Sequence, residues 1–289
     1  YFGLRLADMA GRYRANVVTI EKPWGEAFSL AELENAVATH RPKILAIVHA
    51  ETSTGICQPM EGIGDLCRQH DCLLLLDTVT SLGAVPLYLD EWKVDLAYSC
   101  SQKGLSCPPG LGPFTMGPRA EAKLAARQDK VPNWYLDVSL LNQYWGSDRV
   151  YHHTAPVNMN FGMREALRLL AEEGLEVAWS RHRSNAELLW AGLERLGLEL
   201  HAPEHLRLPT LTTVRIPEGV DGKAFTLHLL NKHGIEVGGG LGALAGKVWR
   251  IGLMGYNSRE ENVDRLLNLL EQELPAFRSS VPVAAAAAA

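Results

Sequence analysis

The stretch LLLLDTVTSLG, residues 73–83, decides the fold class of this chain. Its four consecutive leucines leave no polar position between them, which is typical of a strand buried on both faces. Similar short apolar runs occur at residues 44–48 and 94–98, and a helical pattern at 63–70 precedes Leu73. Short apolar strands that alternate with helices predict an α/β fold, in which a mostly parallel sheet has helices on both faces.

Three polar residues come just after these predicted strands: Thr52, Asp77 and Lys103. The right-handed crossover rule places the C-terminal ends of the parallel strands at one edge of the sheet. Ligands of open α/β sheets bind outside that edge. We therefore expect the three side chains to line one pocket.

The second half of the chain has a different pattern. Long helical patterns cover residues 162–174 and 179–196, and shorter strands and helices follow up to residue 274. This order predicts a large domain at 1–175, a smaller α+β C-terminal domain at 176–277 and a tail at 278–289. The chain opens on Tyr1 without a methionine, so we expect that the N-terminal part of the large domain is missing from it.

The composition excludes several classes of partner. Hydrophobic residues make up 47% and charged residues 21%, and the net charge of −5 is spread without a basic run, so neither nucleic acid nor a membrane surface is an expected partner. No apolar stretch approaches the roughly 18 residues of a membrane span. Five cysteines without a C-x-x-C pair indicate free thiols in the cytoplasm. The ten histidines show no metal-ligand spacing, so no metal site is predicted.

Lys103 and Asp77 together suggest a particular chemistry. Lys103 follows a strand and lies among small residues, and a lysine held in a pocket is a nucleophilic amine. Its position alone, however, favours an ordinary surface-loop lysine, because lysines are mostly exposed. Asp77 ends a buried strand, where a carboxylate needs a cationic partner or hydrogen bonds, unless it only caps a turn. Pyridoxal phosphate would use both groups, since its pyridine nitrogen pairs with an aspartate and its aldehyde reacts with a lysine.

Five segments extend this argument to a family. They are HAETSTG (49–55), LLLLDTVTSLG (73–83), YSCSQKGLSCPPG (98–110), YHHTAP (151–156) and GKVWRIG (246–252). In this order they resemble the class V aminotransferases, in particular the alanine–glyoxylate and serine–glyoxylate (serine–pyruvate) aminotransferase family in its bacterial, cyanobacterial-like form. The resemblance covers about residues 1–275. It implies an aspartate-aminotransferase-like fold of type I.

The resemblance also implies roles for residues around the cofactor, pyridoxal 5'-phosphate. Lys103 forms the Schiff base and carries the proton during the reaction, and Asp77 binds the pyridine nitrogen. Val79 packs against one face of the ring and Phe2 stacks on the other. Thr52 donates a hydrogen bond to the ring oxygen.

Further roles concern the phosphate and the substrate. Gln102 reaches the phosphate, whereas Tyr151 and Thr154 bind the phosphate in the neighbouring subunit, which implies a homodimer with shared active sites. Arg250 binds the substrate carboxylate, for which a planar guanidinium is well suited. The substrates are small amino and keto acids.

The predicted function is therefore transamination of alanine or serine, with glyoxylate or pyruvate as acceptor. One alternative is a catalytically inactive, truncated dimerisation module. Another is a cysteine desulfurase-like enzyme of the same superfamily, but that needs a mobile cysteine late in the chain, and all five cysteines precede residue 108. A nicotinamide dehydrogenase is disfavoured, because the glycine-rich run at 238–245 leaves no room for a helix before the strand predicted at 248–253.

Overall fold

A four-stranded sheet forms the first half of the molecule. The computed structural model describes residues 1–278. The strands are β1 (Ile44–Val48), β4 (Leu73–Asp77), β5 (Leu96–Tyr98) and β6 (Phe114–Met116), in the spatial order β1-β4-β5-β6. β1, β4 and β5 are parallel, and β6 joins the edge antiparallel to β5. The mostly parallel sheet predicted from the apolar runs is confirmed.

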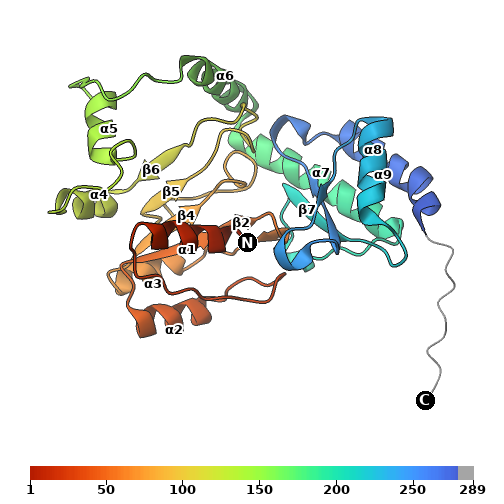
Figure 1. Cartoon of the computed structure of the whole chain (residues 1–289), viewed down its shortest axis with the longest axis horizontal. Helices are drawn as coiled ribbons and strands as arrows, with labels where there is room; N and C mark the ends of the chain where they lie inside the picture. The colour runs from red at the N-terminus through yellow and green to blue at the C-terminus, as the bar shows by residue number, and fades with distance from the viewer. Residues whose placement is uncertain (279–289) are drawn as a thin grey trace.

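Three helices lie near this sheet (Figure 1). They are α1 (Phe2–Arg12), α2 (Leu30–His40) and α3 (Ile63–Gln69). Ser29 and Glu32 form the capping box that starts α2. Leu33 of α2 and Ile63 of α3 pack in the same buried cluster as Leu74 and Leu76 of β4, so β4 is the centre of this core.

A projecting arm follows β6. It consists of α4 (Pro118–Ala125), α5 (Val138–Trp145) and α6 (Val157–Glu173), and Figure 1 shows α5 and α6 standing away from the sheet. Neither α5 nor α6 has a buried residue. The single chain therefore leaves both faces of these helices largely uncovered.

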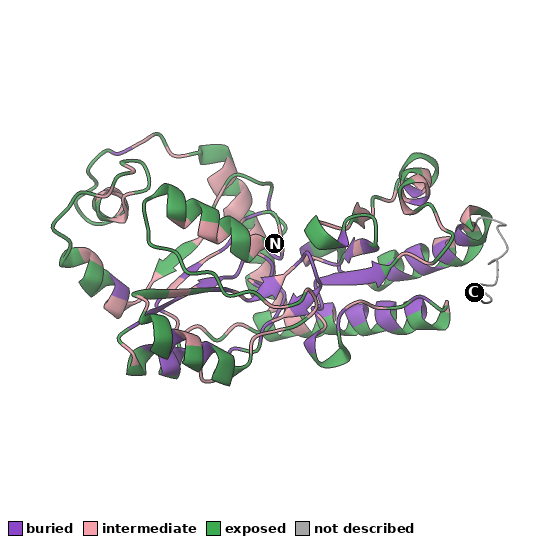
Figure 2. Cartoon of the chain, turned by 60° about the horizontal axis from the view of Figure 1, so that its bottom comes forward, coloured by how far each residue is buried: buried purple, intermediate pink, exposed green. Residues whose placement is uncertain are grey.

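The second half has its own sheet and core. The sheet has the order β7-β9-β8, with every pairing antiparallel. Its strands are β7 (Leu211–Arg215), β8 (Gly238–Gly239) and β9 (Val248–Gly252), and its long helices are α7 (Leu175–Arg195), α8 (Gly222–His233) and α9 (Glu260–Glu273). Leu189, Phe225, Trp249 and Leu267 belong to a buried cluster separate from that around β4. Figure 2 shows buried residues along α7 and on the neighbouring strand.

Short elements complete the chain. The strands β2 (Ala50–Glu51) and β3 (Ile56–Cys57) form a hairpin after β1. Single 3-10 turns occur at Glu204–Leu206, Gly242–Leu244, Gly255–Asn257 and Leu274–Phe277. Gly55 in the hairpin has φ +75°, and a Cβ there would lie 2.8 Å from the Thr213 hydroxyl, so this turn of the first half packs directly against β7.

Some sequence predictions were wrong in detail. A strand was predicted at residues 16–20, but this segment is exposed and unpaired in the structure. The helices α1, α4 and α5 were not predicted, and α6 and α7 start earlier than their patterns suggested.

The glycine-rich run at 238–245 contains the short strand β8 and a 3-10 turn, with no helix to receive a dinucleotide. The tail predicted from residue 278 lies, apart from Arg278 itself, outside the described residues. Among the described helices, none combines the length and the apolar character needed to cross a membrane.

Candidate active site

Parallel pairing brings the predicted pocket residues to one sheet edge. Asp77 ends β4, Thr52 lies four residues after the end of β1, and Lys103 lies five residues after the end of β5. Val48 pairs with Asp77, and Asp77 pairs with Tyr98, so these three strand ends lie side by side. The Cys100 thiol donates to the Val79 carbonyl at 3.7 Å, which links the segment that leads to Lys103 with the segment that follows Asp77.

Asp77 is a buried carboxylate without a cationic partner. It is only 6% exposed. Its Oδ1 accepts the Val79 backbone N–H at 2.9 Å, and its Oδ2 accepts the Tyr98 hydroxyl at 2.6 Å. Burial raises the pKa of Asp77, although both hydrogen bonds oppose that effect. No ion pair within residues 1–278 neutralises this carboxylate, so a positively charged donor is the partner that it lacks.

Lys103 lies in a tightly folded loop. The backbone N–H of Ser106 donates to the Lys103 carbonyl at 3.0 Å, and a Cβ added to Gly104 would lie 2.3 Å from the Leu82 carbonyl oxygen. The side chain of Lys103 is half-buried. In the described part of the chain, its ammonium group forms no hydrogen bond or ion pair. A half-buried amine without an acidic partner is suited to react rather than to form a structural salt bridge.

The start of α1 lies next to this edge. The Phe2 backbone N–H donates to Glu51 Oε2 at 3.0 Å, which fixes the start of the helix against the β1–β2 region. The Arg5 guanidinium lies 5.0 Å from the centre of the Phe2 ring, and its charge also acts on Tyr98, the partner of Asp77. Phe2 is therefore held close to the strand ends, as its predicted stacking role requires.

Arg250 reaches the site from the other half of the molecule. It lies on β9; its Nε donates to the Gly239 carbonyl at 2.7 Å, and its Nη1 lies 3.5 Å from the Thr52 carbonyl oxygen. Burial lowers the pKa of Arg250, and the carboxylate of Glu51 partly offsets this. No ion pair forms on this guanidinium anywhere in residues 1–278. A cation that is partly desolvated and still has free donors is suited to bind an anion.

The residues predicted to bind the phosphate, Gln102, Tyr151 and Thr154, lie at the surface. Gln102 is exposed, and its side chain forms no hydrogen bond within the described residues. Tyr151 is 74% exposed, and its hydroxyl lies 3.2 Å from the Thr154 hydroxyl, so these two act as one polar pair. No described hydrogen bond, ion pair or ring contact links this pair to Asp77 or Lys103 of the same chain.

Three features near the strand ends were missed from the sequence. Tyr98 was recognised only as the end of a strand, and its link to Asp77 depends on the register of β4 and β5. Glu51 accepts hydrogen bonds from Phe2 and from the Ser53 hydroxyl. His49, which is 3% exposed, packs edge-on against Trp92, and its Nδ1 has no hydrogen-bond partner among the described residues.

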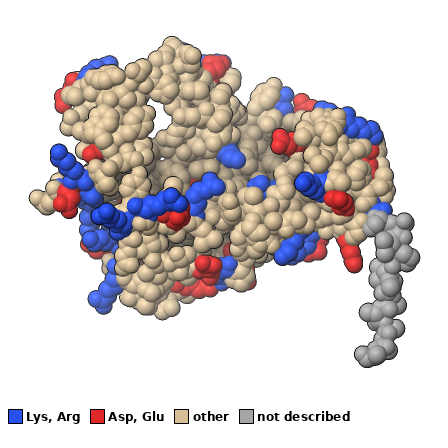
Figure 3. Space-filling model, viewed as in Figure 1, with Lys and Arg blue, Asp and Glu red and all other residues tan. Residues whose placement is uncertain are grey.

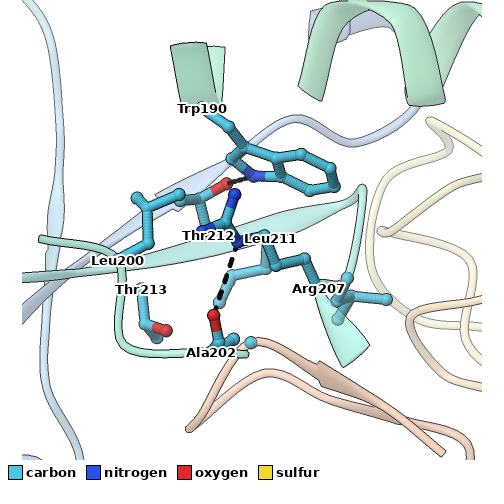
Figure 4. A pocket seen from close by; sticks show the side chains of 9 residues that line it. Trp190, Leu200, Ala202, Arg207, Leu211, Thr212 and Thr213 are labelled. Atoms are coloured by element: carbon cyan, nitrogen blue, oxygen red, sulfur yellow. Dashed lines mark hydrogen bonds between the residues drawn. The ribbon is translucent and has the colours of Figure 1, made fainter. Parts of the chain in front are cut away.

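Two other places in the molecule have features of a ligand site. The crevice in Figure 4, lined by Trp190 and Arg207 among others, has a volume of about 10 Å³, so it has room for no more than one water molecule. The second place is a cluster of His228, His233 and Glu273, whose ligand atoms lie within 4.8 Å of one another. The sequence showed no metal-ligand spacing, and the cluster forms because α8 and α9 bring these three side chains together. The Lys232 ammonium lies 2.8 Å from the same carboxylate and already supplies the opposite charge.

Comparisons with known proteins agree with this geometry. The family description "Aminotransferase class-V" matches residues 4–266. The alanine–glyoxylate aminotransferase of Oryctolagus cuniculus is 44% identical over 94% of this chain and 71% of that protein. The crystal structure of an alanine–glyoxylate aminotransferase from Nostoc sp. has a TM-score of 0.93 and 67% identity, over 95% of this chain and 73% of that one. The structure of the ureidoglycine–glyoxylate aminotransferase from Bacillus subtilis has a TM-score of 0.94 and 40% identity, over 98% and 73%. The predicted aspartate-aminotransferase-like fold of type I is confirmed.

The buried His49 leads to a prediction about acid stability. Burial lowers its pKa from 6.5 to about 4. Because the folded state resists protonation here, the stability that His49 contributes is present above pH 6.5 and is lost as the pH falls towards 4. At about 1.4 kcal/mol for each pKa unit, the loss is about 3 kcal/mol.

The free energy of unfolding should fall between pH 7 and pH 4, and we expect this fall to be smaller in His49→Gln by about 3 kcal/mol. The measurement is chemical denaturation at both pH values without added cofactor, with the exposed His205→Gln as the matched control. An unchanged pH dependence in His49→Gln would show that the imidazole is not held neutral by burial.

Proposed function

Because the chain belongs to the class V aminotransferase family, we propose that it transfers the amino group of alanine or serine to glyoxylate or pyruvate, with pyridoxal phosphate as cofactor. The observation that carries this proposal is the pair formed by Asp77 and Lys103 at one sheet edge. Among the residues that the structure describes, Asp77 is a buried carboxylate without a cationic partner, and Lys103 is a half-buried amine without an acidic partner. The relatives do not favour the alternatives of a desulfurase or an inactive dimerisation module.

The residues present fit this cofactor. A protonated pyridine nitrogen would supply the positively charged donor that the buried carboxylate of Asp77 lacks. The amine of Lys103 would hold the aldehyde carbon. The bound cofactor supplies an electron sink, which makes loss of a proton from the α carbon of an amino acid feasible.

The protein side chains then divide the remaining work. Asp77 keeps a proton on the ring nitrogen. Lys103 would accept the proton from the substrate α carbon and donate it to the carbon that comes from the cofactor aldehyde. Arg250 orients the substrate through its carboxylate, since a guanidinium with free donors matches two carboxylate oxygens. With the cofactor bound, Phe2 and Val79 would cover the two faces of its ring, Thr52 would hydrogen-bond the ring oxygen, and Gln102 would bind the phosphate.

We also propose that the enzyme is a homodimer with shared active sites. The arm bears large apolar side chains that a monomer leaves in water: Trp134, Trp145 and Phe161 are 59%, 64% and 64% exposed. On the face that Figure 3 shows, few charged side chains lie around α5, whereas α6 carries the ion pairs of Arg168 with Glu165 and Glu172. An aromatic surface of this kind is typical of an interface. The exposed pair Tyr151–Thr154 lies on the same arm, where it would reach the phosphate in the partner subunit.

The proposal also covers the division of the chain into domains and the cellular location of the protein. We propose a large domain at 1–175 and a small domain at 176–277; the separate buried clusters and the start of α7 at Leu175 support this division. Arg250 then acts across the boundary between them. A cytoplasmic location is supported by the five cysteines, all of which are free thiols.

The first prediction from this proposal concerns Arg250. Replacing it with lysine keeps the charge but removes the bidentate geometry. We expect Arg250→Lys to raise KM for alanine and for glyoxylate together by about tenfold, equivalent to about 1.4 kcal/mol, while cofactor affinity stays near that of the wild type. Both constants should change, because each substrate presents its carboxylate to the same side chain.

Steady-state kinetics with each substrate varied in turn checks this prediction. Arg215→Lys, on the neighbouring strand β7, is the matched control. A change in only one KM, or a parallel loss of cofactor, would show that Arg250 is not the carboxylate anchor. A wild-type enzyme that converts neither alanine nor serine would contradict the proposed donors.

The second prediction concerns sharing of sites between subunits. One inactive subunit carries Lys103→Ala, and the other carries Tyr151→Phe with Thr154→Ala. In a mixed dimer with shared sites, one site combines all the defects and the other is intact. We therefore expect the purified mixed dimer to recover about half of the wild-type activity, measured at a cofactor concentration that just saturates the wild type.

The two parental homodimers are the controls, and both should be nearly inactive. If each site belonged to one chain alone, both sites of the mixed dimer would be defective. A verified mixed dimer without activity would therefore contradict sharing.

A further inference from the structure

The Asp77 carboxylate is held by two donors on opposite oxygens. The backbone N–H of Val79 lies 2.9 Å from Oδ1, and the Tyr98 hydroxyl lies 2.6 Å from Oδ2. In the described part of the chain, these are the only groups that donate to it. An O–H···O⁻ contact of about 2.6 Å is characteristic of a strong, charge-assisted hydrogen bond.

The position of Tyr98 is fixed by the sheet. Tyr98 and Asp77 are register partners at the ends of β5 and β4. The Tyr98 carbonyl accepts the Thr78 N–H at 2.9 Å and the Thr78 hydroxyl at 2.8 Å. The backbone on both sides of the Asp77–Tyr98 contact is therefore held in place, which leaves the phenol little freedom to move away from Oδ2.

The charge state of the pair is also defined. Burial raises the pKa of Tyr98, and the carboxylate of Asp77 raises it further, so the phenol stays protonated and remains a donor at neutral pH. Its hydrogen bond stabilises the ionised form of Asp77, against the burial that favours the protonated form. Without Tyr98, one oxygen of a buried carboxylate would have no donor from the protein.

We propose that Tyr98 is a positioning residue for the cofactor: its hydroxyl keeps Asp77 ionised and oriented, so that the proton stays on the pyridine nitrogen. This inference rests on the proposed function. It assigns to Tyr98 an effect that depends on the ring nitrogen and acts only through Asp77. A residue that merely tied β4 to β5 would affect any ligand of the site equally.

Two ligands separate these roles. One is pyridoxal phosphate, and the other is its carbocyclic analogue, in which a C–H group replaces the ring nitrogen. We expect Tyr98→Phe to weaken binding of pyridoxal phosphate to the apoenzyme by about tenfold, the order for loss of a hydrogen bond to a charged group. Binding of the carbocyclic analogue should change less than twofold, because it offers Asp77 no proton to bind.

Controls and a second readout complete the test. The matched control is Tyr88→Phe, because Tyr88 is 41% exposed. This variant should bind both ligands as the wild type does. Adding Tyr98→Phe to Asp77→Asn should cause no further loss of affinity for pyridoxal phosphate. With cofactor labelled at the ring nitrogen, NMR should show a protonated nitrogen in the wild type and a shift towards the neutral form in Tyr98→Phe.

The outcomes are distinct. Equal losses for the two ligands in Tyr98→Phe would make Tyr98 a structural residue and overturn the inference, as would no loss for either ligand. A wild-type protein that binds neither ligand would instead overturn the proposed function, and the inference with it. Circular dichroism of Tyr98→Phe identifies a folding defect, which also counts as a structural role.

Discussion

The parallel pairing of β1, β4 and β5 is the constraint on which the rest of the structure depends. β4 lies between two parallel neighbours and contributes Leu74 and Leu76 to the core, each fully buried. Because parallel strands end at the same edge, the burial of these leucines also fixes where Asp77 ends the strand. The hydrophobic core and the position of the carboxylate are therefore set by the same residues.

The site is built from charges that the chain leaves incompletely neutralised. Within residues 1–278, Asp77 has two hydrogen bonds but no cationic partner, Lys103 has no acidic partner, and Arg250 is partly desolvated without an ion pair. Leaving charges in this state disfavours folding, since buried charges are stable only with partners. A cofactor with a protonated nitrogen, an aldehyde and a substrate carboxylate beside it would satisfy all three groups. The unpaired charges lower the stability of the fold at the strand ends, and the same charges would bind the cofactor and the substrate.

Local signals predicted much of the fold, and non-local contacts explain what was missed. The capping box at Ser29 and the buried strand of leucines could be predicted, because each pattern is formed by residues a few positions apart in the sequence. The strand predicted at 16–20 was wrong because an apolar pattern cannot form a strand without a neighbour to pair with. The role of Tyr98 depends on the register between two strands, and the Arg250–Thr52 contact joins residues 198 positions apart. Family resemblance could supply Arg250, but it offered no reason to single out Tyr98.

The central claim is that Lys103 is the residue that binds the cofactor covalently. Borohydride reduction of the purified holoenzyme, followed by proteolysis and mass spectrometry, tests it most directly, because reduction fixes the cofactor to the amine that holds it. We expect a pyridoxyl group on Lys103 and no label in a Lys103→Ala protein treated in the same way. Label on a different lysine, such as Lys93 or Lys123, or no label on a protein saturated with cofactor, would contradict it.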